Sequence, residues 1–211
     1  MVLCTILSFV MTTVLMYRTF LPTDTYSFFV SMLIGVLSIW AAIAYSVGKN
    51  AYGYKGIGDI FVFIFFGIVS VCGSYFLFVQ SFSAYILLPG AAIGMLSMAV
   101  LNLNNMRDIK SDRMAGKLSI ALRMGLENAM KYEMVLLHIP IILLIIFLFR
   151  NGFFRGGNYY SFFILLFIIP IGRLGYQIRS VEKPADLDQN LKKVGIITFL
   201  ISVVMAVCIN L

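Results

Sequence analysis

Two aspartates, Asp108 and Asp112, stand four residues apart in the most highly charged stretch of this 211-residue chain. If this stretch is helical, both carboxylates lie on one face, about one turn apart. Magnesium suits such a pair, because proteins commonly bind it through one or two carboxylates together with the phosphates of a substrate. The alternative is a solvated loop in which Asp108 pairs with Arg107 and Asp112 with Arg113. Spacing alone does not decide between a metal site and a salt-bridged loop.

Amide and basic side chains surround the two aspartates. They supply hydrogen-bond donors and positive charge of the kind that binds diphosphate oxygens. The candidates for this role are Asn104, Asn105, Arg107, Lys117 and Arg123. The stretch 104–130 therefore has the composition of a site for a metal–diphosphate complex.

The rest of the chain is organised as long apolar blocks. Hydrophobic residues make up 61% of the sequence and charged residues 12%, whereas soluble proteins carry roughly 25% charged residues. A helix needs about 20 apolar residues to cross the hydrocarbon layer, and helices satisfy their own backbone hydrogen bonds in lipid. We therefore predict an all-α, polytopic membrane helix bundle forming a single domain over residues 1–211. The seven predicted spans are 1–17, 26–47, 58–79, 84–103, 131–149, 159–178 and 192–210.

The distribution of lysine and arginine predicts the orientation of the bundle in the lipid bilayer. Of the 16 basic residues, all but Arg18, Arg150 and Arg155 fall in one set of alternate connections. Loops rich in lysine and arginine stay in the cytoplasm. We expect the N-terminus and the segment 104–130 to be cytoplasmic and the C-terminus to lie outside. This asymmetry explains most of the net charge of +7, and the sequence gives no sign of nucleic-acid binding.

The segment 104–125, NNMRDIKSDRMAGKLSIALRMG, resembles the second aspartate-rich motif of the UbiA superfamily of intramembrane prenyltransferases. Within it, the sequence is most similar to the MenA family, the 1,4-dihydroxy-2-naphthoate polyprenyltransferases. A bare D-x-x-x-D pattern is weak evidence, but the extended string, placed before three final spans, is specific. The segment 52–59, YGYKGIGD, is similar to the start of a middle span in the same enzymes. The resemblance covers essentially the whole chain.

The resemblance implies transfer of a polyprenyl group from its diphosphate to 1,4-dihydroxy-2-naphthoate, with decarboxylation to demethylmenaquinone in the bacterial cytoplasmic membrane. It implies Mg²⁺ held by Asp108 and Asp112. It also implies that Lys55 binds the diphosphate, with Tyr54 as a weaker candidate and Tyr45 with Lys49 as an alternative pair. Other possibilities are an aromatic acceptor such as 4-hydroxybenzoate or, in a different class, a small membrane transporter.

Members of the superfamily usually have nine helices and a first aspartate-rich motif between helices two and three. Before Asp108 this chain contains only two acidic residues, Asp24 and Asp59, which are far apart. Its seven spans match helices three to nine. We therefore expect that the chain is truncated at its N-terminus and has little or no activity alone.

Overall fold

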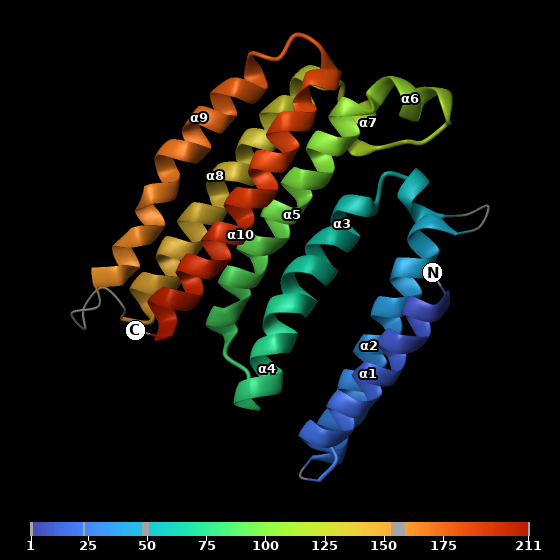
Figure 1. The fold of residues 1–211 in the computed structure, drawn as a ribbon, viewed down its shortest axis with the longest axis vertical. Helices are drawn as coiled ribbons and strands as arrows, with labels where there is room; N and C mark the ends of the chain where they lie inside the picture. The colour runs from blue at the N-terminus through green and yellow to red at the C-terminus, as the bar shows by residue number, and fades with distance from the viewer. Residues whose placement is uncertain (1, 23, 48–50, 153–158, 211) are drawn as a thin grey trace. The chain divides into compact units, whose positions relative to one another are not determined.

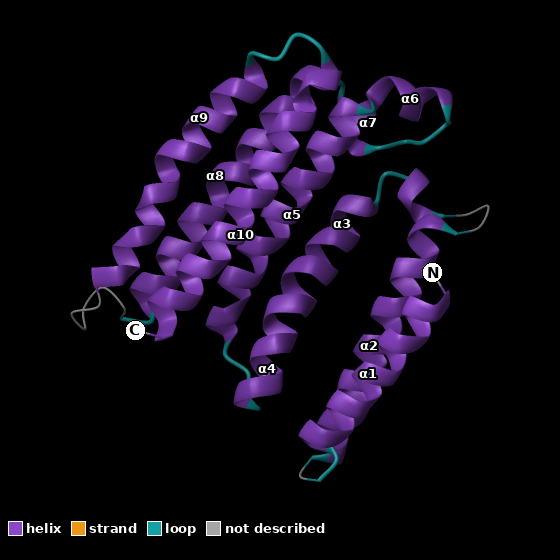
Figure 2. Ribbon diagram, viewed as in Figure 1, coloured by secondary structure: helices purple, strands orange, loops and turns teal. Residues whose placement is uncertain are grey.

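The computed structural model describes residues 2–22, 24–47, 51–152 and 159–210, and within them the regular structure is helical (Figure 2). Seven of the helices in the described part are long and apolar enough to cross a membrane. They span Leu3–Phe20, Thr25–Tyr45, Gly58–Val79, Ala84–Arg107, Leu126–Arg150, Phe162–Arg179 and Pro184–Cys208. The prediction of an all-α, polytopic membrane protein with seven spans is confirmed.

The chain divides into two compact units, Met1–Gly53 and Tyr54–Leu211. The first unit is a pair of helices, α1 (Val2–Phe20) and α2 (Thr25–Ser46). Asp24 starts α2 as its N-cap, since its carboxylate accepts a hydrogen bond from the backbone N–H of Ser27. At the far end of α2, the Tyr52 hydroxyl donates to the Ala41 carbonyl (2.7 Å) and so folds the following segment back onto the helix.

The second unit holds the aspartate-rich segment and the five remaining spans (Figure 1). The first of these spans is composite: α3 (Gly58–Val62) continues through π-helical turns (Phe63–Cys72) into α4 (Gly73–Val79). Next come α5 (Leu87–Arg107), two short helices α6 (Ile109–Met114) and α7 (Ile120–Met124), and α8 (Leu126–Arg150). The chain ends with 3₁₀ turns (Tyr159–Phe167), α9 (Ile168–Arg179) and α10 (Asp188–Asn210).

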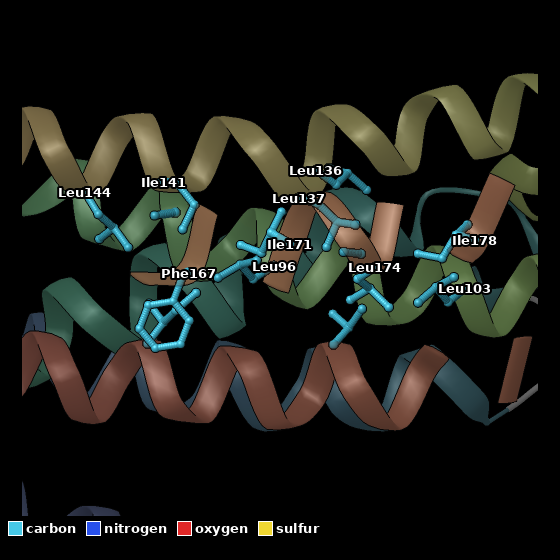
Figure 3. Packing of buried hydrophobic residues seen from close by; sticks show 14 of the residues in the cluster. Leu96, Leu103, Leu136, Leu137, Ile141, Leu144, Phe167, Ile171, Leu174 and Ile178 are labelled. Atoms are coloured by element: carbon cyan, nitrogen blue, oxygen red, sulfur yellow. The ribbon is translucent and has the colours of Figure 1, made fainter. Parts of the chain in front are cut away.

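Helix α5 is the centre of this unit, because it packs against the π-helical segment, α8 and α10. Its buried face carries Leu96 and Leu103, which belong to the same buried apolar cluster as Leu136, Leu137 and Leu144 of α8 (Figure 3). Side chains of α9 complete the cluster. The many apolar side chains exposed elsewhere on the helices face outward, as expected of a protein whose solvent is lipid.

Glycines let the π-helical segment approach α5 closely. A Cβ atom at Gly67 would lie 2.5 Å from the Cα of Gly94 and 2.6 Å from the carbonyl oxygen of Gly90. Small residues at such crossings are the usual way for membrane helices to bring their backbones together. The helix that carries the aspartate-rich segment is thereby fixed against its neighbour.

Several helix boundaries differ by a few residues from those predicted, among them the starts of two helices. Helix α8 begins at Leu126, five residues before the predicted span, and α10 begins at Asp188, four residues before it. Both extensions are polar, so hydropathy did not include them, yet both are supported by ion pairs at i,i+4 spacing: Glu127–Lys131 (2.7 Å) and Asp188–Lys192 (3.2 Å).

Candidate active site

The aspartate pair lies where α5 passes into α6 at one end of the second unit (Figure 1). The chain bends slightly at Asp108, but the backbone bonding continues: Asp108 N–H donates to Asn104 C=O (3.0 Å) and Asp112 N–H to Asp108 C=O (2.8 Å). The two aspartates are therefore one helical turn apart, as their spacing predicted. Asp112 is buried, whereas the Asp108 side chain is 34% exposed.

Arg107 pairs with Asp108 through two hydrogen bonds. Its Nε donates to Asp108 Oδ1 and its Nη2 to Asp108 Oδ2, each at 2.9 Å. Nη2 also donates to Asn104 Oδ1 at 2.7 Å. Because this fork matches a carboxylate on both oxygens, it is a strong form of ion pair. The predicted Arg107–Asp108 contact is present.

Lys117 is the partner of Asp112. Its Nζ lies 2.9 Å from Asp112 Oδ2 and donates to Asn105 Oδ1 at 3.1 Å. The alternative pairing of Asp112 with Arg113 is not among the ion pairs of the described residues. Each carboxylate of the motif is thus neutralised by a basic side chain that the sequence suggested as a diphosphate ligand.

The Arg107 guanidinium, which donates hydrogen bonds to Asp108, lowers the pKa of that carboxyl below its ordinary value. Partial burial opposes this shift, and the positive charges of Arg107 and Lys117 add to it. The site therefore presents Asp108 as a carboxylate at neutral pH. An ionised carboxylate is the form that binds a metal ion.

The segment after α6 turns back because of Gly116 and Ser119. Gly116 has φ +68°, a conformation that residues with side chains rarely adopt. Its turn brings the Lys117 N–H to the Asp112 carbonyl (2.9 Å). Ser119 then caps α7 by accepting a hydrogen bond from the Leu122 N–H. This local geometry returns Lys117 to the aspartates.

The returning segment is bonded to the chain that leads into α3. Leu118 N–H donates to the Tyr54 carbonyl (2.8 Å), and Arg123 Nη2 donates to the Lys55 carbonyl (2.7 Å). The structure thereby brings the backbone of Lys55 next to the segment that follows the aspartates. Arg123, predicted to bind diphosphate, has a structural contact here, and the side chains of Tyr54 and Lys55 are exposed.

The alternative pair, Tyr45 and Lys49, falls at the end of the first unit. The Tyr45 ring packs edge to face against Tyr52, with centroids 5.5 Å apart. Lys49 lies outside the described residues. A role of this pair in diphosphate binding stays a prediction.

Sequence reasoning missed Asp188, the first residue of α10. Its Oδ1 accepts a hydrogen bond from Arg107 Nη1 at 3.0 Å, although the two residues are 81 positions apart. In the sequence, Asp188 stands far from the aspartate-rich segment, just before the last apolar block. No local pattern could have identified this contact, because it depends on how α10 packs against α5.

A second polar cluster, also missed, lies buried between α3, α5 and α8. Asn102 Nδ2 donates to Glu133 Oε2 (2.8 Å) and to the Ala129 carbonyl (3.0 Å). The Tyr132 hydroxyl contacts Asp59 Oδ2 at 3.3 Å. Glu133 and Asn102 are almost fully buried, and Glu133 Oε1 and Asn102 Oδ1 are buried without a hydrogen-bond partner. Ionisable groups within membrane spans are rare and are candidates for function.

The donor set at the aspartate pair fits magnesium. Asp108 and Asp112 offer carboxylate oxygens on successive helical turns, and Asn104 and Asn105 add amide oxygens. Hard oxygen ligands are those that Mg²⁺ prefers. No group of three His, Cys, Asp or Glu side chains converges among the described residues, so further ligands would come from a substrate, water or another segment.

Comparison with known proteins identifies relatives of this chain. The family model of the UbiA prenyltransferase family matches residues 1–203. The 1,4-dihydroxy-2-naphthoate octaprenyltransferase of Haemophilus influenzae is 33% identical over 173 residues, which are 82% of this chain and 55% of that protein. The enzyme of the same name from Escherichia coli is 42% identical over 155 residues, 74% of this chain and 48% of that protein.

The relatives are not all octaprenyltransferases. A 2-carboxy-1,4-naphthoquinone phytyltransferase of Synechocystis is 31% identical over 93 residues, covering 44% of this chain and 30% of that protein. No solved structure matches the chain significantly. The chain spans about half the length of the two octaprenyltransferases it matches. The match over nearly all of its residues shows that the chain belongs to the UbiA prenyltransferase family.

Proposed function

We propose that this chain carries the second aspartate-rich half of a magnesium-dependent prenyltransferase site. The reaction is transfer of a polyprenyl group from its diphosphate to 1,4-dihydroxy-2-naphthoate, with loss of the carboxylate as CO₂, in menaquinone biosynthesis. The observation that carries the proposal is the aspartate pair with its two basic partners, placed at the end of a membrane helix bundle of this family.

Asp108 and Asp112 hold the metal in this proposal, and Arg107, Lys117 and Lys55 bind the oxygens of the diphosphate. The metal ion, when bound, acts as a Lewis acid that stabilises the negative charge developing on the departing diphosphate. Arg107 and Lys117 stabilise the same charge through directed N–H donors. The C–O bond then breaks, the allylic carbon becomes cationic, and the electron-rich ring attacks it. The ring carboxylate leaves as CO₂, and its bonding electrons restore aromaticity.

The uneven distribution of lysine and arginine supports an orientation with the aspartate pair at the cytoplasmic face. In this orientation a water-soluble acceptor arrives from the cytoplasm, while the isoprenoid tail stays in lipid. The two related octaprenyltransferases come from bacteria, which supports a location in the bacterial cytoplasmic membrane. 4-Hydroxybenzoate is the alternative acceptor, and the same assay tests it.

Binding of inorganic pyrophosphate to the purified chain in detergent, measured calorimetrically with and without Mg²⁺, tests the site. We expect magnesium-dependent binding that the double substitution Asp108→Asn with Asp112→Asn abolishes. Lys110→Met is the matched control, because Lys110 lies between the two aspartates in sequence, is exposed, and has no ion pair among the described residues. Binding that survives loss of both carboxylates would refute the metal role.

The acceptor is tested in a chimera, because this chain spans about half of its relatives and we expect little turnover from it alone. Its matched residues replace the corresponding segment of the Escherichia coli octaprenyltransferase, and mass spectrometry identifies the prenylated product. We expect product from 1,4-dihydroxy-2-naphthoate and none from 4-hydroxybenzoate. Product only from 4-hydroxybenzoate would contradict the proposed acceptor. Robust turnover by the 211-residue chain alone would contradict the expectation that it has little activity without the rest of the enzyme.

A further inference from the structure

The guanidinium of Arg107 is held on two sides by different helices. Its Nε and Nη2 donate to Asp108 at 2.9 Å, and its Nη1 donates to Asp188 Oδ1 at 3.0 Å. Asp108 precedes α6, whereas Asp188 begins α10. Arg107 and Asp108 are both only partly exposed, at 27% and 34% of their side chains. The two acidic groups therefore hold one cation from separate parts of the chain.

The hydrogen bonds from Arg107 and a bound metal ion would share the same two oxygens of Asp108. Both of its oxygens accept hydrogen bonds from Arg107 in this structure. If Asp108 turned an oxygen to a metal ion, Arg107 would lose part of this pairing. Its Nε and Nη2 would then be available to an incoming anion, but a long flexible side chain freed at one edge also gains rotamer freedom.

We propose that Asp188 is a positioning residue for Arg107. It holds the Nη1 edge of the guanidinium independently of Asp108, so the Nε and Nη2 edge stays at the aspartate pair and binds a diphosphate oxygen. This inference rests on the proposed function, because it assumes that Arg107 meets diphosphate. It assigns the start of the last helix a part in substrate binding.

A purely local role for Asp188 is the competing explanation. Its Oδ2 pairs with Lys192 one turn later at 3.2 Å, and a carboxylate in the first turn of a helix stabilises that helix. The two roles make different predictions. Loss of a local role lowers the stability of α10 and leaves ligand binding unchanged, whereas loss of a positioning role weakens pyrophosphate binding while Arg107 is present.

The test measures pyrophosphate affinity by calorimetry in saturating Mg²⁺ on the purified chain. We expect Asp188→Asn to weaken binding about three- to tenfold, because it removes a charge-assisted hydrogen bond that is partly exposed to solvent. Asp188→Glu should restore most of the affinity. Asp186→Asn is the matched control: Asp186 is an exposed acidic residue two positions earlier with no ion pair among the described residues.

A double-mutant cycle with Arg107→Gln separates positioning from structure. If Asp188 acts through Arg107, Asp188→Asn has no effect on pyrophosphate affinity once Arg107 is replaced. Affinity for Mn²⁺, followed by electron paramagnetic resonance, should change less than twofold in Asp188→Asn, because Asp188 binds Arg107 and not the metal. An equal loss of pyrophosphate affinity in both backgrounds, or no loss in either, overturns the inference.

These outcomes separate failure of this inference from failure of the proposed function. If Asp188→Asn is silent while the double substitution Asp108→Asn with Asp112→Asn abolishes pyrophosphate binding, the site stands and the positioning role is wrong. If the unchanged chain binds no pyrophosphate in Mg²⁺, the site assignment fails, and the role of Asp188 fails with it. Lys192→Met should leave pyrophosphate affinity unchanged, whereas a loss matching that of Asp188→Asn would overturn the positioning role, because Lys192 pairs with Asp188 and not with Arg107.

Discussion

Replacing Lys117 by methionine should make the folded protein depend on magnesium for part of its stability. Lys117 is the cation paired with Asp112, and their side chains are only 18% and 11% exposed. Methionine keeps the length and the apolar stem of lysine but removes the charge. Asp112 then remains as a nearly buried carboxylate without its cationic partner, unless a bound cation replaces Lys117.

The size of the effect follows from burial. Removing one partner from a fully buried ion pair costs about 3–5 kcal/mol, and from an exposed pair about 0–1 kcal/mol. The pair lies at the end of the bundle and is slightly exposed, so we expect a loss of about 2 kcal/mol. For a chain of this size, 1 kcal/mol shifts the unfolding temperature by roughly 2–4 °C, so the variant should unfold about 4–8 °C lower.

Thermal unfolding followed by far-ultraviolet circular dichroism in detergent, with and without Mg²⁺, measures this effect. The added metal should recover most of the lost stability in Lys117→Met and raise the unfolding temperature of the unchanged protein less. Lys110→Met is again the control and should behave like the unchanged protein in both buffers. If Lys117→Met is as stable as this control without metal, the Asp112 pair contributes nothing and the reasoning is refuted.

Three further predictions follow from contacts elsewhere in the second unit. Gly67→Ala should lower the free energy of unfolding by about 1–3 kcal/mol, because the new Cβ would meet the backbone of α5. Gly73→Ala, whose Cβ would have open space around it, should leave the stability unchanged, and thermal unfolding compares the two variants. Glu133→Gln should raise the unfolding temperature, since the new amide supplies donors beside the unpartnered Asn102 Oδ1, and an equal or lower temperature would contradict this. The pKa of Asp108 is lowered in the folded protein, so its ion pair with Arg107 should contribute its full stabilisation above about pH 4 and progressively less as the pH falls further. Unfolding temperatures measured over an acid pH series, with Asp108→Asn for comparison, would test this.

The membrane architecture was predictable because hydrophobic length is a property of contiguous residues. Seven apolar blocks gave seven spans, and only polar extensions such as the first turn of α10 escaped the prediction. The π-helical turns between Phe63 and Cys72 were not predicted, since they widen a helix without changing its hydropathy. Here the packing of backbones, and not composition, decides the geometry.

The site was predictable where it is local and not where it is tertiary. The four-residue spacing of Asp108 and Asp112 placed them one turn apart, and the nearby Arg107 proved to be in contact. Pairing of Asp112 with Lys117 in place of Arg113 depends on the turn at Gly116, whose conformation a sequence does not display. The contacts of Arg107 with α10, and of Glu133 with α5, join residues far apart in sequence and required the folded structure.

The backbone bonds that tie the lead-in of α3 to the segment after α6 make Lys55 a clean experimental probe. The Lys55 carbonyl oxygen accepts a hydrogen bond from Arg123, and the Tyr54 carbonyl oxygen accepts one from the Leu118 N–H. Both contacts therefore involve the main chain at positions 54 and 55. A substitution at Lys55 changes the side chain and leaves these anchors in place. A change in pyrophosphate affinity at this position would therefore report on the Lys55 side chain and not on these backbone bonds.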